Sequence, residues 1–232
     1  MSLISEQAAA LGQRERNKLD KLRRIKHAAR ELFVAKGFDD TTTREIATRA
    51  SVGIGTIFVY AANKRDLLFL IVNDELDKIE QTAEAAVEET ASLLDNLLRV
   101  ARIHYAFFAQ QPALSRLVLR EMVFYESGTQ AGRFQRTRER LIDLLGRIAA
   151  TAMAQKTIIV SEEPRFIGWT VFSVFQVELR RWLSDDNPNQ QEGLQALERA
   201  WRLVITGLAP TRAALRLTTR GNRSALRSSL SR

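Results

Sequence analysis

This chain of 232 residues has no cysteine, and it is also poor in proline and glycine. The missing cysteines exclude disulfides, thiolate catalysis and cysteine-based metal sites. Only 4 prolines and 11 glycines interrupt the chain, which favours long helices over many short strands. No apolar run reaches the roughly 18 residues of a membrane-spanning helix, and the N-terminus lacks an apolar segment of signal-peptide length. We therefore expect an all-α, cytoplasmic protein with no membrane partner.

The positive charges are concentrated near the two ends of the chain. The formal net charge is +8, and 45% of the residues are hydrophobic, which is enough to bury a core. Residues 1–65 contain 13 Lys and Arg against 7 Asp and Glu, while residues 66–210 contain 16 against 20. Residues 211–232 contain six Arg and no acidic residue. This distribution indicates a polyanionic partner for the N-terminal part, with a solvated basic face as the alternative.

Apolar spacing and capping residues predict about nine helices. Thr42 and Glu45 have the spacing of a capping box, and Asn63 caps the helix that follows. Ser161 is expected to cap a later helix, and residues 156–160 could instead form an isolated strand. The expected helices cover residues 18–36, 43–50, 54–60, 64–80, 86–111, 113–126, 130–155, 162–184 and 190–208.

The second and third expected helices are joined by about three residues that include Gly53, which is the pattern of a helix-turn-helix. In such a unit the third helix enters the major groove, and its N-terminal amides point at phosphates. Short helix pairs also occur in helical proteins that bind no DNA, so the pattern alone is not specific. The candidate DNA-binding residues are Thr42, Thr43, Arg44, Gly55, Thr56, Phe58, Val59, Tyr60 and Lys64.

The wider string around this unit is more specific. It consists of Gly37, Phe38, Thr41, Thr42, Arg44, Glu45, Ile46, Ala47, Ala50, Val52, Gly55, Thr56, Ile57, Phe58, Tyr60, Asn63, Lys64 and Leu67. Over about residues 20–70 the chain thereby resembles the N-terminal domain of the tetracycline-repressor (TetR) family. The resemblance implies an all-helical homodimer with an N-terminal DNA-binding head and a C-terminal ligand-binding body. It also implies a repressor that a small molecule releases from a palindromic operator.

Four residues depart from the usual pattern of that family. Phe58 stands where Tyr is usual, and Ile54 and Val59 stand where polar residues are common. Ala61 replaces an aromatic residue, which affects how the third helix packs on the fourth. The recognition helix is therefore unusually apolar. We expect its base readout to depend on contacts with thymine methyl groups and on DNA shape.

Aromatic and sulfur-containing side chains gather in the C-terminal part, where the resemblance implies a pocket for an apolar or aromatic effector. An aromatic stripe at helical spacing is more often simply core, and a lone histidine on such a face is more often a satisfied core residue. Both interpretations remain open here. The candidate ligand-binding residues are His104, Phe107, Phe108, Met122, Tyr125, Trp169, Phe172 and Gln176.

The last two helices are the expected dimer surface, again by resemblance, because the final helix has a wide apolar stripe. The candidate interface residues are Val174, Arg181, Leu194, Leu197, Trp201 and Ile205. The resulting domain prediction has four parts: a flexible extension over 1–17, a DNA-binding domain over 18–65, a ligand-binding and dimerisation domain over 66–210, and a flexible basic tail over 211–232.

An enzyme and a protein-binding adaptor are the competing interpretations. Against an enzyme stand the missing cysteines, two distant histidines (His27 and His104), and the lack of a phosphate loop or a metal-ligand cluster. Against an adaptor stands the basic head, which an adaptor does not need. The sequence thus predicts a ligand-responsive regulator whose partners are operator DNA, a small effector and a second copy of itself, with no cofactor or metal.

Overall fold

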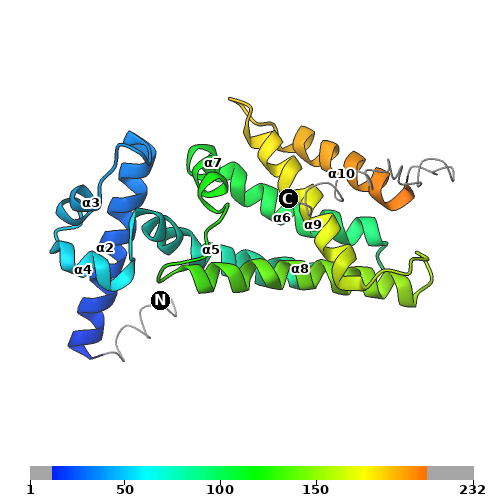
Figure 1. Cartoon of the computed structure of the whole chain (residues 1–232), viewed down its shortest axis with the longest axis horizontal. Coiled ribbons are helices and arrows are strands. Elements are labelled where there is room, and N and C mark those ends of the chain that lie inside the picture. The colour runs from blue at the N-terminus through cyan, green and yellow to red at the C-terminus, as the bar shows by residue number, and fades with distance from the viewer. Residues whose placement is uncertain (1–11, 208–232) are drawn as a thin grey trace, which may run out of the picture.

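The computed structural model describes residues 12–207, and these residues form nine α-helices without a strand, which confirms the predicted all-α fold. Helices α2 to α4 form a small unit, here called the head, at one end of an elongated molecule (Figure 1). The remaining six helices form the body. The helices are α2 (Gln13–Lys36), α3 (Thr43–Arg49), α4 (Ile54–Tyr60), α5 (Lys64–Ala85), α6 (Leu93–Gln110), α7 (Pro112–Glu121), α8 (Ala131–Ala154), α9 (Pro164–Leu183) and α10 (Gln190–Thr206).

The head is held together by a small apolar core and by its capping groups. Ile25, Ile46 and Ile57, one from each of the three helices, are fully buried. The predicted capping box is present: the Thr42 hydroxyl accepts from the Glu45 amide at 3.2 Å, and the Glu45 carboxylate accepts from the Thr42 amide at 2.8 Å. Two of the amides that the start of α3 would leave without a partner are thereby satisfied.

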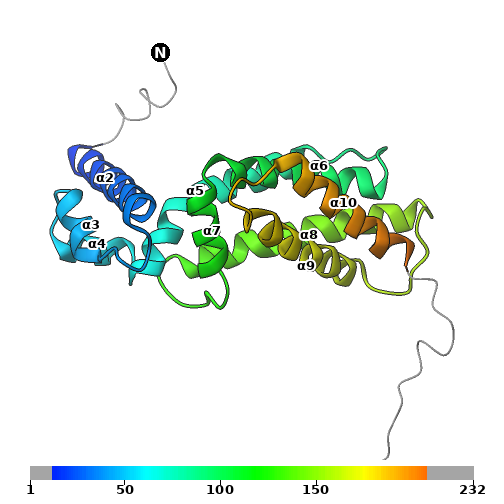
Figure 2. The same ribbon diagram turned by 90° about the horizontal axis from the view of Figure 1, so that it is seen from above.

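The body consists of long antiparallel helices, with α5 leaving the head and running beside α8 (Figures 1 and 2). Helix α9 packs closely on α8 because two glycines meet at the crossing. A Cβ atom on Gly168 would lie 2.6 Å from the Ile142 carbonyl oxygen and 2.7 Å from the Gly146 nitrogen. Only residues without a side chain allow the two backbones to approach so closely. Helix α10 then covers α6 and α9.

Several expected boundaries are wrong. Helix α2 begins at Gln13, so part of the predicted flexible extension is helical. Residues 86–92 precede α6 as a loop, because the buried Asn96 amide binds the Glu88 backbone at 2.8 and 3.0 Å. Helix α9 begins at Pro164 with Glu163 rather than Ser161 as its N-cap, since proline is favoured at the first helical position. Residues 156–160 form no strand.

Two predicted segments lie wholly or partly outside the described residues. These are the N-terminal extension up to residue 11 and the basic tail over 211–232. Within residues 12–207, none of the helices combines the length and apolar character needed to cross a membrane.

Candidate nucleic-acid interface

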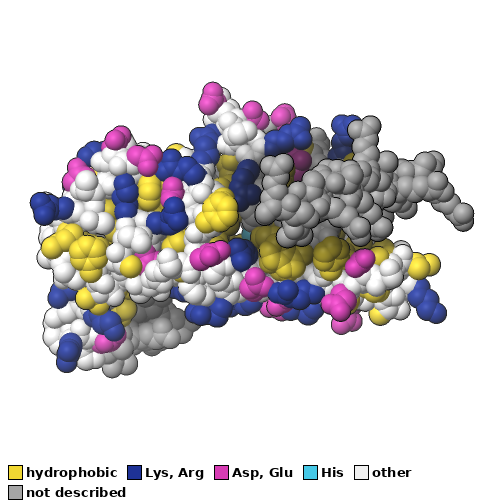
Figure 3. Space-filling model, viewed as in Figure 1, with side chains coloured by type: hydrophobic (Ala, Val, Ile, Leu, Met, Phe, Trp, Pro, Cys, Tyr) yellow, Lys and Arg dark blue, Asp and Glu magenta, His cyan; other side chains and the backbone are white. Residues whose placement is uncertain are grey.

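Helix α4 lies on the surface of the head and presents an apolar face to solvent. The turn between α3 and α4 includes Ser51 in the left-handed region at φ 52°, and Gly53 is the N-cap of α4. Ile57 turns into the core, whereas the exposed fractions of Ile54, Phe58 and Val59 are 40%, 53% and 69%. Figure 3 shows apolar side chains at the surface on this side of the head. The apolar recognition helix expected from the sequence is thus also an exposed one.

Arg24 holds the turn that orients α4, and sequence reasoning missed it. Its guanidinium donates to the backbone carbonyls of Ala50 and Ser51 at 2.7 and 3.1 Å, and its Nε donates to Asp20 at 3.0 Å. The last carbonyls of a helix have no partner inside that helix, so a cation from α2 stabilises the end of α3. The sequence places Arg24 on α2 next to the buried Ile25, but it does not show that the partners of Arg24 are backbone carbonyls about 26 residues later in the chain.

The polar DNA-binding candidates divide into free and engaged side chains. Arg44 is exposed on α3 and makes no ion pair with any described residue. Thr42 is engaged in the capping box, while Thr43 and Thr56 are half-buried beside it and on α4. Gly55 is exposed, with open space where a Cβ would be. Arg44 is therefore the cation of this set that is directly available to a phosphate.

Tyr60 and Lys64 already have partners inside the head. The Lys64 ammonium donates to the carbonyls of Phe38 and Asp39 at 2.6 and 3.0 Å and lies 4.6 Å from the centre of the Phe38 ring. The Tyr60 hydroxyl donates to the Lys18 carbonyl at 3.3 Å. Any phosphate contact by these two side chains would compete with contacts that stabilise the head.

A buried carboxylate connects the head to the body. Asp66, in the first turn of α5, is fully buried and accepts hydrogen bonds from the Tyr125 hydroxyl and from three backbone amides. Burial acts to raise the pKa of Asp66, but these hydrogen bonds outweigh it and hold the pKa below the ordinary value. Tyr125 also stacks on Phe69 at a centroid distance of 3.9 Å. We call Asp66 and its hydrogen-bond donors the joint between head and body, and Tyr125 is one of those donors.

The other candidate ligand residues do not line one common cavity. His104 is buried, with one ring nitrogen 2.9 Å from the Val100 carbonyl and the other 3.0 Å from Glu80, so it is a satisfied core residue. Phe107 and Phe108 line a cavity of about 20 Å³ beside α7, which is room for about one water molecule. The remaining candidates are spread out: Met122 is half-buried after α7, Phe172 is buried, and Trp169 is 38% exposed.

Unpaired polar atoms mark the region between α6 and α9. The Tyr105 hydroxyl, the Trp182 indole nitrogen and the Gln176 carbonyl oxygen are buried and have no hydrogen-bond partner among the described residues. The rings of Tyr105 and Trp182 stack at 4.7 Å, and burial raises the pKa of Tyr105. A buried polar group without a partner is unfavourable by about 1–3 kcal/mol, so these three atoms are the unsatisfied polar groups of the described α6–α9 contact.

The candidate dimer residues also divide into two groups. Leu197 and Trp201 are core residues, with exposed fractions of 0% and 1%, and the Trp201 indole donates to the Val171 carbonyl at 3.0 Å. Both side chains face inward, where α10 packs on α6 and α9 of the same chain. Val174 and Leu194 are half-buried, and Arg181 and Ile205 are exposed. In α9 the outward face includes Phe166 and Val177, which are 58% and 60% exposed.

The residues 12–207 contain no cluster of three or more His, Cys, Asp or Glu that could hold a metal ion.

Residues 25–71 match the family model of the bacterial regulatory proteins of the tetR family. Among curated proteins, a fatty acid metabolism regulator protein of Bacillus subtilis is 22% identical over 83% of this chain and 98% of its own length. The helix-turn-helix transcriptional regulator HbdR of Aromatoleum is 39% identical, but only over 26% of this chain and 27% of its own length.

Solved structures share the whole fold. The FadR repressor of Thermus thermophilus, crystallised with lauroyl-CoA, is 23% identical, with a TM-score of 0.63 over 86% of this chain and 99% of its own. FadR of Bacillus subtilis, crystallised with stearoyl-CoA, is 19% identical, with a TM-score of 0.64 over 80% and 98%. The family match and the exposed helix-turn-helix agree with the predicted DNA-binding head: residues 25–71 are a helix-turn-helix domain of the tetR family of bacterial regulatory proteins.

Proposed function

We propose that this chain is a homodimeric repressor that occupies a palindromic operator and leaves it when an effector binds the body. In this proposal the head over residues 18–65 binds DNA, and residues 66–210 bind the effector and the second copy. The observation that supports it best is the surface of α4, where Ile54, Phe58 and Val59 are exposed while Ile57 anchors the helix to the core. Such a regulator acts on the bacterial chromosome, so we assign it to the cytoplasm.

Base recognition is proposed to depend on the three exposed apolar side chains of α4. Ile54, Phe58 and Val59 cannot donate or accept hydrogen bonds, whereas the thymine methyl group is the apolar feature of the major groove. We expect duplexes selected by the protein from a random pool to have thymines where α4 enters the groove. Replacing those thymines by uracil removes only the methyl groups and should weaken binding several-fold. Equal affinity for the two duplexes would contradict methyl readout.

Phosphate binding is proposed for Arg44 first, because its guanidinium is exposed and unpaired among the described residues. Arg44→Met should lower DNA affinity and reduce the slope of log affinity against log salt by about 0.9 for each phosphate that the arginine neutralises. Arg199→Met is the matched control, since Arg199 is an exposed arginine on α10, far from the head. Equal salt slopes in both variants would remove Arg44 from the interface.

The dimer is proposed to form through the outward face of α9 together with the end of α10. Phe166 and Val177 are exposed on α9, and Ile205 is 37% exposed on α10. Figure 3 shows apolar side chains along the body where α9 lies. Val177→Glu should convert a dimer to monomers in sedimentation velocity, whereas Ala106→Glu, on the exposed side of α6, should not. Monomeric behaviour of the unmodified chain would refute the dimer.

The effector is proposed to be a fatty acyl-CoA. This chain aligns with nearly the whole length of a fatty acid metabolism regulator, and of two FadR regulators that were crystallised with lauroyl-CoA and stearoyl-CoA. The apolar packing between α6 and α9, with its unpaired polar atoms, suits a long apolar ligand that has a few polar groups. Lauroyl-CoA should change the tryptophan fluorescence and release DNA, while free CoA and laurate should do neither at the same concentration. Release by none of these ligands would refute the acyl-CoA effector but leave DNA binding intact.

A further inference from the structure

The recognition helix has no cap from its own sequence. Helix α4 has only seven residues, its N-cap Gly53 offers no side chain, and its last turn contains no basic residue. A helix this short is marginal by itself, and the carbonyls of its last turn lack partners inside the helix. Whatever satisfies those carbonyls therefore has a strong influence on whether α4 is ordered.

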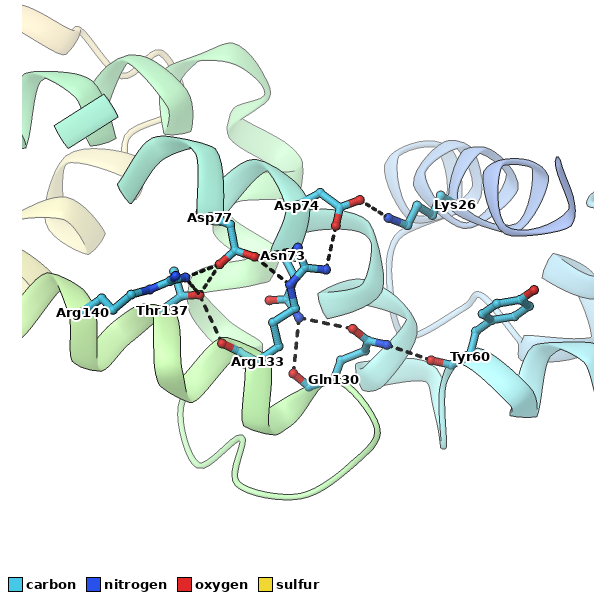
Figure 4. Close-up of polar contacts among 9 residues, drawn as sticks. All are labelled: Lys26, Tyr60, Asn73, Asp74, Asp77, Gln130, Arg133, Thr137 and Arg140. Carbon is cyan, nitrogen blue, oxygen red and sulfur yellow. Dashed lines mark hydrogen bonds and ion pairs between the residues drawn. The ribbon is translucent and has the colours of Figure 1, made fainter. Parts of the chain in front are cut away.

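The body supplies such a cap. The Gln130 side-chain amide donates to the Tyr60 carbonyl at 3.0 Å, and Tyr60 is the last residue of α4. Gln130 lies directly before α8, as the N-cap residue of that helix. Figure 4 shows the Gln130 side chain extending from the start of α8 to the end of α4. One side chain thus joins the DNA-facing helix to a long helix of the body.

Gln130 is itself held in place from two sides. The amide of the fully buried Asn73, on α5, donates to the Gln130 backbone carbonyl at 3.3 Å and to its side-chain oxygen at 3.4 Å. The Gln130 backbone amide donates to Asp66 at 2.9 Å. The same carboxylate accepts from the Ala62 amide at 2.7 Å, in the turn that follows α4, and from the Thr129 amide at 2.7 Å. The turn after α4 and the start of α8 therefore share one buried anion.

Farther along α8, a chain of ion pairs continues this connection. Arg133 binds Asp74 at 2.7 Å and Asp77 at 2.6 Å, both on α5, and Asp77 also binds Arg140. Asp74 in turn pairs with Lys26, on α2 of the head. Arg133 and Arg140 come from α8, so a shift of α8 changes the ion pairs of α5, including the one to Asp74, the carboxylate that also pairs with Lys26 of the head.

We propose that Gln130 is a positioning residue for DNA recognition: it caps the recognition helix from the effector-binding body and so makes the order of α4 depend on the placement of α8. A displacement of α8 by 1–2 Å, the size of helix shifts in many switching proteins, breaks a hydrogen bond of 3.0 Å. Loss of this cap loosens α4 without unfolding the head. The inference rests on the proposed function only in taking α4 as the DNA-reading helix.

The test compares two glutamines that flank the same helix. Gln130→Met keeps the length of the side chain and removes the donor to Tyr60. Gln155→Met is the matched control, because Gln155 follows α8 and its amide donates to a backbone carbonyl, that of Glu89, at 2.9 Å. Hydrogen exchange of the full chain should accelerate about 2- to 10-fold over residues 54–62 in Gln130→Met and stay unchanged there in Gln155→Met. Unchanged exchange over 54–62 in Gln130→Met overturns the proposal.

DNA binding supplies the second readout. On a duplex selected by the unmodified chain, Gln130→Met should bind about 2- to 10-fold more weakly, with a smaller decrease on random duplex. An equal decrease on both duplexes would overturn the positioning role, because a merely destabilised head weakens all DNA binding alike. If the unmodified chain binds no duplex, the proposed function fails, while the exchange experiment still decides whether Gln130 caps α4.

Discussion

Gly128 is the position at which a single methyl group should do most damage to the joint between head and body. Its φ is +128°, in the region that favours glycine. A Cβ added there would lie 2.5 Å from one Asp66 carboxylate oxygen and 2.8 Å from the carboxylate carbon. Asp66 is buried and bound by four donors, so it has little freedom to move aside. Gly128→Ala must therefore strain the backbone, displace Asp66, or both.

The size of the effect follows from these two contributions. A non-glycine residue in such a backbone conformation costs about 1–3 kcal/mol. Weakening one or two of the hydrogen bonds to Asp66 adds about 1 kcal/mol each. The free energy of unfolding should fall by about 2–5 kcal/mol in total. For a protein of 150–250 residues each kcal/mol shifts Tm by about 2–4 °C, so Tm of this chain of 232 residues should fall by roughly 10 °C.

Thermal unfolding followed by circular dichroism, at one fixed protein concentration, measures this shift. Gly132→Ala is the matched control, because Gly132 lies inside α8 and the nearest atom to an added Cβ is the Arg136 guanidinium at 3.5 Å. Alanine is favoured over glycine by about 0.5–1 kcal/mol in a helix, so the control should match or exceed the unmodified Tm. A Tm for Gly128→Ala within about 1 °C of the unmodified chain would refute the reasoning about Asp66.

Three further predictions concern stability and DNA binding. The folded-state pKa of Asp66 lies below its ordinary value of 3.8, so the ionised carboxylate stabilises the fold fully above that pH, and this stabilisation is lost as the pH falls through the folded-state pKa. The difference in unfolding free energy between the unmodified chain and Asp66→Asn should therefore be largest at pH 7 and shrink below about pH 4. A difference that does not depend on pH would contradict this. Trp201→Ala should lower the unfolding free energy by about 3–5 kcal/mol in denaturant titrations, whereas Ile205→Ala should change it by about 0.5 kcal/mol or less in the monomer. Deleting the Arg-rich residues 211–232 should lower binding to random DNA at low salt in filter-binding assays, and equal binding would leave the tail without this role.

The head could be predicted from the sequence because its determinants are local. The capping box at Thr42 and Glu45 needs only a spacing of three residues, and the structure contains it. The ends of α4 at Ile54 and Tyr60 also agree with the sequence, since Gly53 marks the turn before it. The exposed, apolar character of α4 follows from the pattern within seven residues, with Ile57 as its inward side chain.

Neither the contacts of Asp66 between head and body nor the division of the body's apolar residues into core and dimer surface could be predicted, because both depend on contacts between residues distant in the sequence. Asp66 could be identified only as a residue near a helix start, whereas its donors Tyr125, Thr129 and Gln130 follow about 60 residues later. The assignment of Trp201 to a dimer surface is wrong because an amphipathic stripe does not indicate which neighbour covers it. In the structure, α6 and α9 of the same chain cover that stripe.

The apolar face of α4 and the hydrogen bond from Gln130 to its last residue together affect how well the protein can discriminate between DNA sequences. Contacts between apolar side chains and methyl groups are short-ranged, and a gap of about 0.5–1 Å already removes a quarter to a half of their attraction. Phosphate contacts by a flexible arginine such as Arg44 tolerate a shift of that size. Loosening α4 at Tyr60 should therefore reduce discrimination between operator and random DNA before it reduces total affinity. A regulator with such a helix needs an accurately placed α4 more than one that reads bases through long polar side chains, and Gln130 is the residue that places it from the body.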